Sequence, residues 1–233
     1  MSERISIIVP VYNERATIAQ VIDRLLTIAL PTPREIIVVN DGSGDGTREA
    51  LDALAGRSAD LAIVHLDVNR GKGYAVRRGF AQAAGTIVAI QDADLELDPA
   101  QLAGLVAPIL ARETDVVYGS RFLGGRPAAP AVTIAANRAL TWLTNALYGS
   151  ALTDMETCYK IMRADVARSL HLEANRFDIE PQITARLLRA GHHVTELPVT
   201  FEARTRKQGK KIGWRDGVKA LNVLVAERFR SVR

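Results

Sequence analysis

Residues 86–98 read Thr-Ile-Val-Ala-Ile-Gln-Asp-Ala-Asp-Leu-Glu-Leu-Asp, an apolar run that passes directly into four carboxylates. The apolar part predicts a strand of a parallel sheet that is buried on both faces. In an extended segment alternate side chains point the same way, so we expect Asp92, Asp94 and Glu96 to face one space. Three carboxylates gathered together repel one another unless a cation lies among them, and oxygen ligands suit Mg²⁺ or Mn²⁺. The segment therefore predicts a divalent-metal site.

The alternative interpretation of this segment is a solvated acidic turn. Asp98 precedes Pro99, and this pair is typical of a capped helix start, which we favour for Asp98. Asp92 and Asp94 directly follow the buried strand, a position that favours metal or diphosphate chemistry.

The remainder of the first half alternates strands with helices. Strands are predicted at Ile5–Val11, Glu35–Val39, Leu61–Leu66, Thr86–Gln91 and Val116–Gly119, and helices at Ala16–Ala29, Thr47–Ala55, Tyr74–Ala84 and Pro99–Ala111. This order predicts an α/β three-layer sandwich with a mostly parallel central sheet covered on both faces. Such sheets bind ligands at the carboxyl ends of their strands, where the polar motifs of this chain fall.

The second half is less regular. We expect helices at Val132–Tyr148, Phe177–Ala190 and Trp214–Phe229, a strand at His193–Val199, and loops at Gly124–Pro130 and Arg204–Gly213. The simplest division is one domain, 1–233, with an elaborated C-terminal half.

Composition excludes several classes of protein. The chain has 233 residues, 48% of them hydrophobic and 24% charged, which suits a globular protein and not a disordered one. One cysteine, Cys158, allows no internal disulfide. We expect no signal peptide and no membrane span, since no apolar run approaches roughly 20 residues. The net charge is +4, but residues 201–233 carry a local +7, which favours a polyanionic partner or a solubilising tail.

Three further motifs follow predicted strands. In the first, Pro10 marks the strand end, Tyr12 can stack on a base, and Asn13 and Glu14 can bind polar edges or ribose hydroxyls; a capped turn is the alternative. In the second, residues 40–47, three glycines allow close approach to a ligand beside Asp41. In the third, residues 69–73, Lys72 and free backbone N–H groups would lie near phosphates at a helix start.

A scatter of cations follows the last strand of the first half and extends into the tail. Arg binds phosphate through paired hydrogen bonds, and Arg121 is the best candidate because it follows a buried strand. The set is Arg121, Arg138, Arg204, Arg206, Lys207, Lys210 and Lys211. The four histidines show no metal-ligand spacing with one another or with Cys158.

Seven motifs in this order resemble family 2 glycosyltransferases of the GT-A (Rossmann-like) fold, most closely the dolichol-phosphate mannosyltransferase-like branch, which moves sugars to polyprenyl phosphates. The motifs lie at residues 9–14, 39–43, 69–73, 92–94, 119–122, 153–160 and 209–217. The resemblance covers nearly the whole chain. Two departures are Asn40, where the family often has Asp, and Glu96, where many relatives have Gln.

The resemblance implies a metal-dependent, inverting transfer of a hexose, mannose or glucose, from a GDP- or UDP-sugar to a dolichyl or undecaprenyl phosphate. Residues 1–122 would bind the nucleotide sugar and residues 123–233 the acceptor. By resemblance the nucleotide sugar would be held by Pro10, Tyr12, Asn13, Glu14, Asp41 and Asp92, to which the loop at residues 69–73 adds Lys72. The metal, Mg²⁺ or Mn²⁺, would be held by Asp92, Asp94 and Glu96. The acceptor phosphate would meet Arg121, Arg138, Arg204, Lys210 and Lys211.

Catalytic roles would fall to Asp94, Arg121 and Asp154, the last as a base if the acceptor is a hydroxyl. A turn aspartate is the alternative for Asp154. The basic tail and the helices carrying Trp142, Tyr148 and Trp214 favour an anionic membrane surface, and hence a peripheral location on its cytoplasmic face. Internal packing or a dimer partner is the alternative for the last helix.

Other functions stay open at this point. A soluble transferase acting on a sugar or small-molecule hydroxyl keeps the fold and changes the acceptor. A nucleotidyltransferase would usually have a Gly-rich basic loop where residues 12–14 stand. A non-enzymatic nucleic-acid binder would use the basic tail, but the tail lacks regularly spaced aromatic residues, so we expect no nucleic acid. The donor base and sugar, the lipid length and the oligomeric state are open.

Overall fold

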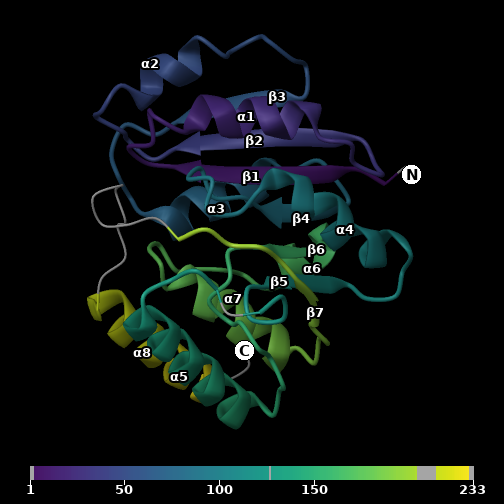
Figure 1. Ribbon diagram of the computed structural model, residues 1–233, viewed down its shortest axis with the longest axis vertical. Helices are drawn as coiled ribbons and strands as arrows, with labels where there is room; N and C mark the ends of the chain where they lie inside the picture. Colours follow the sequence, from purple (N-terminus) through teal and green to yellow (C-terminus); the bar gives the residue numbers. More distant parts are fainter. Residues whose placement is uncertain (1–2, 126, 204–213, 231–233) are drawn as a thin grey trace.

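The computed structural model describes residues 3–125, 127–203 and 214–230. Strands from both halves of the chain form one sheet in the order β3-β2-β1-β4-β6-β5-β7 (Figure 1). The strands are β1 (Ile5–Val11), β2 (Arg34–Asn40), β3 (Leu61–His65), β4 (Ile87–Ile90), β5 (Val116–Ser120), β6 (Lys160–Arg163) and β7 (Thr195–Pro198). All neighbours pair in parallel except β6, which is antiparallel to both β4 and β5. The mostly parallel sheet of the prediction is confirmed.

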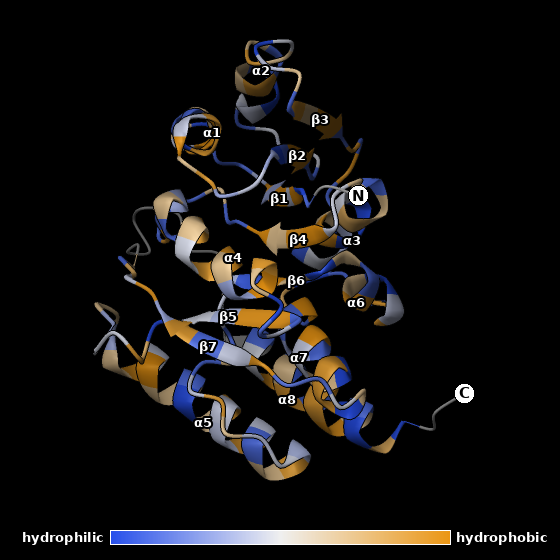
Figure 2. Ribbon diagram, turned by 90° about the vertical axis from the view of Figure 1, so that its right-hand side faces the viewer, coloured by the Kyte–Doolittle hydropathy of each residue, from blue (hydrophilic) through white to orange (hydrophobic). Residues whose placement is uncertain are grey.

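Helices cover both faces of this sheet (Figure 2). The helices are α1 (Ile18–Thr27), α2 (Thr47–Asp52), α3 (Lys72–Gln82), α4 (Leu102–Leu110), α5 (Ala131–Tyr148), α6 (Ala164–Ser169), α7 (Ile179–Arg189) and α8 (Trp214–Phe229), with a 3₁₀ turn, η1 (Pro99–Gln101). α1 and α4 lie on one face, whereas α3 and α6 lie on the other. α5 and α8 pack on each other and on α7 beyond the end of the sheet.

Sequence periodicity located every strand of the first half to within two residues, but it missed β6 and α6. Lys160–Arg163 is four residues long and charged at both ends, so it lacks the apolar run that marks a buried strand. Its pairing with β4 and β5 comes from long-range contacts, which a local pattern does not record.

Pro10 illustrates how the first strand ends. Pairing of β1 with β4 stops at Ile8, while pairing with β2 continues to Val11. The amide of Gln91 donates to the carbonyl of Ile8, and backbone groups two residues apart in a strand face the same side. The position where Pro10 lacks an N–H therefore lies beyond the last pair with β4, so the proline removes no ladder hydrogen bond.

The last helix docks through one face and leaves an apolar face exposed. Ala220, Leu224 and Glu227 of α8 are buried, and the hydroxyl of Tyr148 in α5 donates to the carbonyl of Leu224 at 2.7 Å. The opposite face exposes Val218, Leu221, Val225 and Phe229. Within the described residues this apolar stripe does not pack into the domain. Tyr148, expected at a membrane interface, instead packs between α5 and α8.

Candidate active site

Of the predicted site residues that the structure describes, those after β1, β2, β4 and β5 lie at the carboxyl edge of the sheet, around the point where the strand order reverses. The chain runs outward from β1 to β2 and β3, then returns to place β4 on the other side of β1. The loops after β1 and β4 therefore flank a topological switch point, where open α/β sheets bind their ligands. Both the motif at residues 10–14 and the acidic motif at residues 92–96 lie there.

The loops after β1 and β2 are joined by side-chain hydrogen bonds. The amide of Asn13 donates to Ser43 Oγ at 2.9 Å, the amide of Glu14 donates to Thr47 Oγ1 at 2.9 Å, and Asn13 Oδ1 accepts from the amide of Gly44. Asn13 has a φ of 50°, a left-handed conformation that Asn tolerates better than most residues. These bonds hold the loop whose Tyr12 side chain is 37% exposed at this edge.

Asp41 orders the neighbouring loop rather than lying open to a ligand. Its Oδ1 accepts from the amide of Arg70, and its Oδ2 accepts from the amide of Gly71 and from Asn69 Nδ2, at 2.7–2.9 Å. The residue is 2% exposed, and burial raises the pKa of its carboxyl. The predicted direct contact of Asp41 with a nucleotide stays a prediction.

The expectation of free backbone amides at the start of α3 is wrong. The amides of Arg70 and Gly71 donate to Asp41, and those of Gly73 and Tyr74 donate to the carbonyls of Arg176 and Asn175. A side chain at Gly73 would meet the carbonyls of Ala174 and Arg176, so this loop packs directly on the segment before α7. The start of α3 thus packs on the segment before α7, and Lys72 is the residue there that could bind a phosphate.

Lys72 belongs to a chain of half-buried and buried charges. Its Nζ lies 2.8 Å from Asp92 Oδ1 and 2.9 Å from Glu180 Oε1, and the other Glu180 oxygen lies 2.8 Å from Lys160 Nζ. Burial alone would lower the pKa of Lys72, but the charges of Asp92 and Glu180 outweigh it and raise this pKa well above its usual range. Burial alone would raise the pKa of Asp92, yet Lys72 keeps it below its usual value. Lys72 is therefore ammonium and Asp92 carboxylate near neutral pH.

The acidic motif forms a turn, so the prediction of an extended segment is wrong. Residues 93–97 turn rather than extend, and Leu95 has a φ of 62°. Asp94 Oδ1 accepts from the amide of Glu96, and Asp98 caps η1 through the amide of Ala100, as the capping interpretation predicts. Alternation does not place the three carboxylates on one face, because the chain reverses between them.

A metal fits this turn only with help from a substrate. Within residues 3–125, 127–203 and 214–230, no three His, Cys, Asp or Glu side chains are grouped closely enough to hold a metal ion by themselves. Mg²⁺ in proteins is commonly held by one or two carboxylates together with substrate phosphates and waters. Carboxylates at Asp92 and Asp94 suit that arrangement, and the assignment of Asp92, Asp94 and Glu96 as ligands stays a prediction.

Arg121 and Asp154 form a two-pronged ion pair on the other side of the site. Arg121 Nε and Nη2 each donate to one oxygen of Asp154 at 2.7 Å, and the amide of Arg121 donates to the same carboxylate at 3.0 Å. Asp154 is fully buried, and its own amide donates to Glu196. Burial alone would lower the pKa of Arg121, but Asp154 outweighs it and raises this pKa. In this geometry Asp154 orients Arg121.

The remaining predicted cations divide into two groups. Arg138 is exposed on α5, with its guanidinium 5.5 Å from the ring centroid of Phe122, which places it close to the loop that begins with Arg121. Arg204, Lys210 and Lys211 lie outside the described residues. The sequence pointed to none of Glu156, Glu180 and Lys160 individually. Glu180 of α7 meets Lys72 of α3 and Lys160 of β6 only through contacts between segments far apart in the chain.

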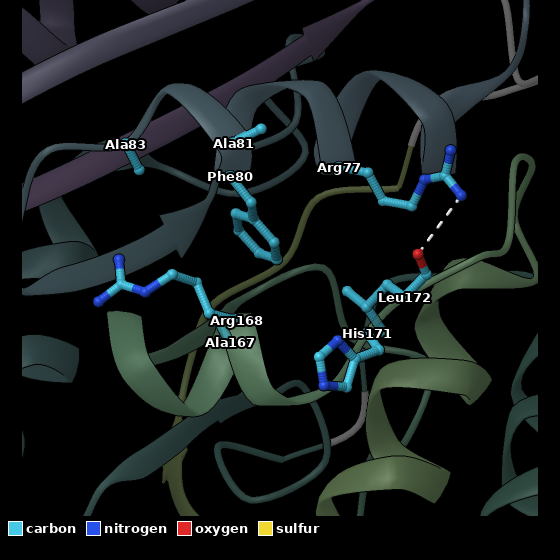
Figure 3. Close-up of a pocket in the computed structure, with 8 residues that line it drawn as sticks. All are labelled: Arg77, Phe80, Ala81, Ala83, Ala167, Arg168, His171 and Leu172. Atoms are coloured by element: carbon cyan, nitrogen blue, oxygen red, sulfur yellow. Dashed lines mark hydrogen bonds between the residues drawn. The ribbon is translucent and has the colours of Figure 1, made fainter. Parts of the chain in front are cut away.

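A pocket on one face of the sheet is a separate feature. It lies between α3 and α6 and is lined by Arg77, Phe80, Ala81, Ala83, Ala167, Arg168, His171 and Leu172 (Figure 3). Arg77 turns its guanidinium to the carbonyl of Leu172 at 3.3 Å. The pocket contains none of the predicted site residues.

Comparison with known proteins gives the family of this chain. The model of the family described as glycosyl transferase family 2 matches residues 6–169. The undecaprenyl-phosphate mannosyltransferase of Micrococcus luteus is 29% identical over 231 residues, which are 94% of this chain and 92% of that protein. The glycosyltransferase AglD of Haloferax volcanii is 32% identical over 85% of this chain, but the chain spans only 33% of its length.

A solved structure shares the fold. Glucosyl-3-phosphoglycerate synthase from Mycobacterium tuberculosis, crystallised with Mn²⁺, uridine diphosphate and phosphoglyceric acid, matches with a TM-score of 0.75 and 20% identity, over 99% of this chain and 80% of that one. This likeness confirms the predicted GT-A fold. The family match over residues 6–169 confirms the predicted resemblance: this chain is a glycosyltransferase that belongs to glycosyl transferase family 2.

Proposed function

We propose that this chain transfers a hexose, mannose or glucose, from a GDP- or UDP-sugar to a polyprenyl phosphate with inversion of the anomeric carbon. The observation that carries the proposal is the guanidinium of Arg121, which Asp154 holds in place through two hydrogen bonds. The charge of Arg121 helps to lower the pKa of Asp92, so the two groups lie within electrostatic reach. The name of the Micrococcus relative, a transferase to undecaprenyl phosphate, supports the same acceptor.

The donor would lie against the loops after β1, β2 and β4. Tyr12 offers a ring for the base, Pro10, Asn13 and Glu14 line the same loop, and Asp41 supports it through the segment that begins α3. A divalent cation, Mg²⁺ or Mn²⁺, bound by Asp92 and Asp94 with Glu96 nearby would offset the charge that grows on the departing diphosphate. Lys72 adds a fixed positive charge behind Asp92.

The state of Asp154 favours a phosphate acceptor over a hydroxyl acceptor. A hydroxyl needs a general base within hydrogen-bond reach, but Asp154 is fully buried and gives both oxygens to Arg121. A phosphate monoester has a second pKa of about 6, so it is largely ionised and already nucleophilic near neutral pH. It needs positioning, which a fixed guanidinium provides. Arg138, and Arg204, Lys210 and Lys211 from outside the described residues, would complete the acceptor side.

The exposed face of α5 and α8 would lie on an anionic membrane. Trp142 and Phe229 are 71% and 77% exposed, and Lys219, Arg228 and Arg230 are exposed beside the apolar stripe of α8. Helices of this composition bind at membrane interfaces. Among the described residues, no helix combines the length and apolar character needed to cross a bilayer. On the basis of the exposed aromatic and basic side chains of α5 and α8, we propose a peripheral location on the cytoplasmic face.

The test of the transfer reaction uses Arg121→Ala. Thermal shift with GDP, UDP and their sugars, with and without Mn²⁺, first identifies the donor, since a ligand that binds only the native state raises its stability. Transfer to a short-chain polyprenyl phosphate should then fall about 100-fold in Arg121→Ala, roughly 3 kcal/mol, while donor binding changes little. Arg78→Ala, an exposed change on α3, is the control. Efficient transfer to a soluble sugar hydroxyl and none to the lipid phosphate would overturn the acceptor assignment.

The test of the membrane face uses anionic liposomes. The wild type should sediment with them at low salt and dissociate as salt rises. Leu221→Glu on α8 should weaken sedimentation, whereas Val68→Glu, at a comparably exposed valine in the loop before α3, should not. Equal sedimentation of the two variants would contradict the assignment of this face.

A further inference from the structure

The segment from Asp154 to Lys160 contains the carboxyl group of Glu156, which has no role in the proposed reaction. Asp154, Glu156 and Lys160 lie on one short segment, and its two ends make different ion pairs, Asp154 with Arg121 and Lys160 with Glu180. Glu156 lies between these ends. Its Oε1 is buried and makes no hydrogen bond to any residue of the described chain.

The neighbouring cation has no hydrogen left for Glu156. Lys160 Nζ donates to the carbonyl of Met155 at 2.9 Å and to that of Thr157 at 2.5 Å, and it lies 2.8 Å from Glu180 Oε2. An ammonium group has three donors, so these partners account for all of them. The first two partners are the residues on either side of Glu156, so Lys160 fixes the backbone that presents Glu156 without satisfying its carboxyl group.

The charges of the neighbouring groups also indicate that Glu156 has no cation as a partner in the described chain. Among the described residues, the linked group contains four carboxyl side chains, Asp92, Asp154, Glu156 and Glu180, and three cations, Lys72, Lys160 and Arg121. Every carboxylate except Glu156 has a cation within 3 Å. A buried carboxylate without a partner is unfavourable in free energy. Such a group either holds a proton or binds a ligand that supplies one.

The groups that face Glu156 come from several elements. Burial raises its pKa to about 7; Lys160 of β6 and Arg121 after β5 lower it, and Glu180 of α7 and Asp154 of the same segment raise it. Glu156 raises the pKa of Arg121 in return, so the carboxyl group lies within electrostatic reach of the proposed phosphate-binding guanidinium. Nη1 of Arg121 makes no hydrogen bond to the residues that the structure describes.

We propose that Glu156 is a further residue of the acceptor subsite and that its carboxyl group shares one proton with the acceptor phosphate. This inference rests on the proposed transfer to a phosphate. The shared proton allows a carboxyl group and a phosphate to lie together beside Arg121 without mutual repulsion. The phosphate's second pKa of about 6 is close enough to that of Glu156 for the proton to move between them.

The transfer step balances with this proton. An oxygen of the singly protonated phosphate forms a bond to the anomeric carbon of the donor. The bond from that carbon to the diphosphate oxygen breaks, and its electron pair leaves with the nucleoside diphosphate. The proton that the phosphate shared passes to Glu156 and is then released to water.

The experiment measures proton uptake when a short-chain polyprenyl phosphate binds at pH 8, by calorimetry in two buffers of different ionisation enthalpy. Both free groups are mostly deprotonated at this pH, so the wild type should take up close to one proton per phosphate bound. Glu156→Gln, in which a neutral amide donates in place of the acid, should take up almost none. Glu113→Gln, an exposed change before β5 at the opposite edge of the sheet, should behave as wild type.

The pH dependence of the acceptor KM gives a second readout. Because binding takes up one proton, linkage predicts that the wild-type KM rises about tenfold per pH unit between pH 8 and 9. The KM of Glu156→Gln should stay flat over that range. A merely structural role would leave the slope unchanged in the variant.

The outcomes separate this inference from the proposed function. Wild-type transfer without proton uptake, or an equal uptake by Glu156→Gln, overturns the role of Glu156 and leaves the transfer reaction standing. Phosphate binding with proton uptake but no transfer overturns the proposed function and supports the subsite. Failure of the wild type to bind any polyprenyl phosphate overturns both.

Discussion

The loops after β1 and β2 and the loops after β4 and β5 meet at one edge of the sheet, but different forces hold them. On the first side, neutral oxygens such as Ser43 Oγ and Thr47 Oγ1 accept hydrogen bonds from backbone amides. On the second side, buried ion pairs such as Lys72–Glu180 and Arg121–Asp154 hold the site. A typical neutral hydrogen bond contributes about 1 kcal/mol, whereas breaking a buried ion pair costs about 3–5 kcal/mol. The hydrogen bonds between the first two loops are thus expected to tolerate single changes that the buried ion pairs do not.

The acidic turn joins the two sides and should show the largest effect. Thr17 Oγ1, at the start of α1, donates to the carbonyl of Ala93 at 2.7 Å, so the turn is fixed to the donor side while Asp92 binds Lys72. Asp94→Asn should lower turnover by about 1000-fold or more, roughly 4 kcal/mol of barrier, because it removes a charged metal ligand. Steady-state kinetics and the melting temperature check this, with Asp98→Asn as the control, which affects the cap of η1 and an exposed ion pair with Arg24. Unchanged turnover in Asp94→Asn would reduce the motif to a structural turn.

Glu180→Gln should break the network of buried ion pairs at its centre. Glu180 is the carboxylate between Lys72 and Lys160, and its neutralisation leaves two buried ammonium groups facing each other. We expect the free energy of unfolding to fall by about 3–5 kcal/mol, measured by urea denaturation. Glu49→Gln, an exposed change on α2, should cost far less. A loss below 1 kcal/mol would remove the contrast between the two sides.

Substitutions of Asn13 test how much the loop after β1 contributes to stability. Asn13→Ala loses the hydrogen bond to the amide of Gly44 and places an alanine at a φ of 50°. Asn13→Gly loses the same hydrogen bond but adopts this φ without strain. We expect the alanine variant to be less stable than the glycine variant by about 1–2 kcal/mol. If the two unfold alike in urea, the left-handed backbone costs nothing at this position.

Glu173 gives the smallest expected effect, because its ion pairs are largely exposed. Hydrogen bonds from Arg230 and then Arg186 lower the pKa of Glu173 to about 2. Since the folded pKa lies below the unfolded value, the contribution to stability is present above about pH 4.5 and is lost as pH falls toward 2. Glu173→Gln should therefore lose less stability than wild type between pH 5 and 2, with a difference below about 1 kcal/mol. A larger loss in the variant would contradict the sign of this shift.

Strand and loop positions in the first half could be predicted from sequence because their causes are local. Ile5–Val11 and Ile87–Ile90 are continuous apolar runs, and the polar motifs follow them directly. The turn at Leu95 could not be predicted in this way, because nothing in alternating Asp-Ala-Asp-Leu-Glu distinguishes an extended segment from a reversal. The contact between Gly73 and residues 174–176 could not be predicted either, since the two segments lie about a hundred residues apart in the chain.

The sequence by itself determined the fold class, the family and the edge of the sheet where the chemistry lies, because buried strands and the motifs after them are short contiguous patterns. Only the tertiary structure decided which charges pair. Lys72 meets Glu180, Arg121 meets Asp154, and Glu156 is left without a cation among the described residues. Electrostatic pairing depends on distance and burial in space, and folding brings together groups that the order of residues keeps apart.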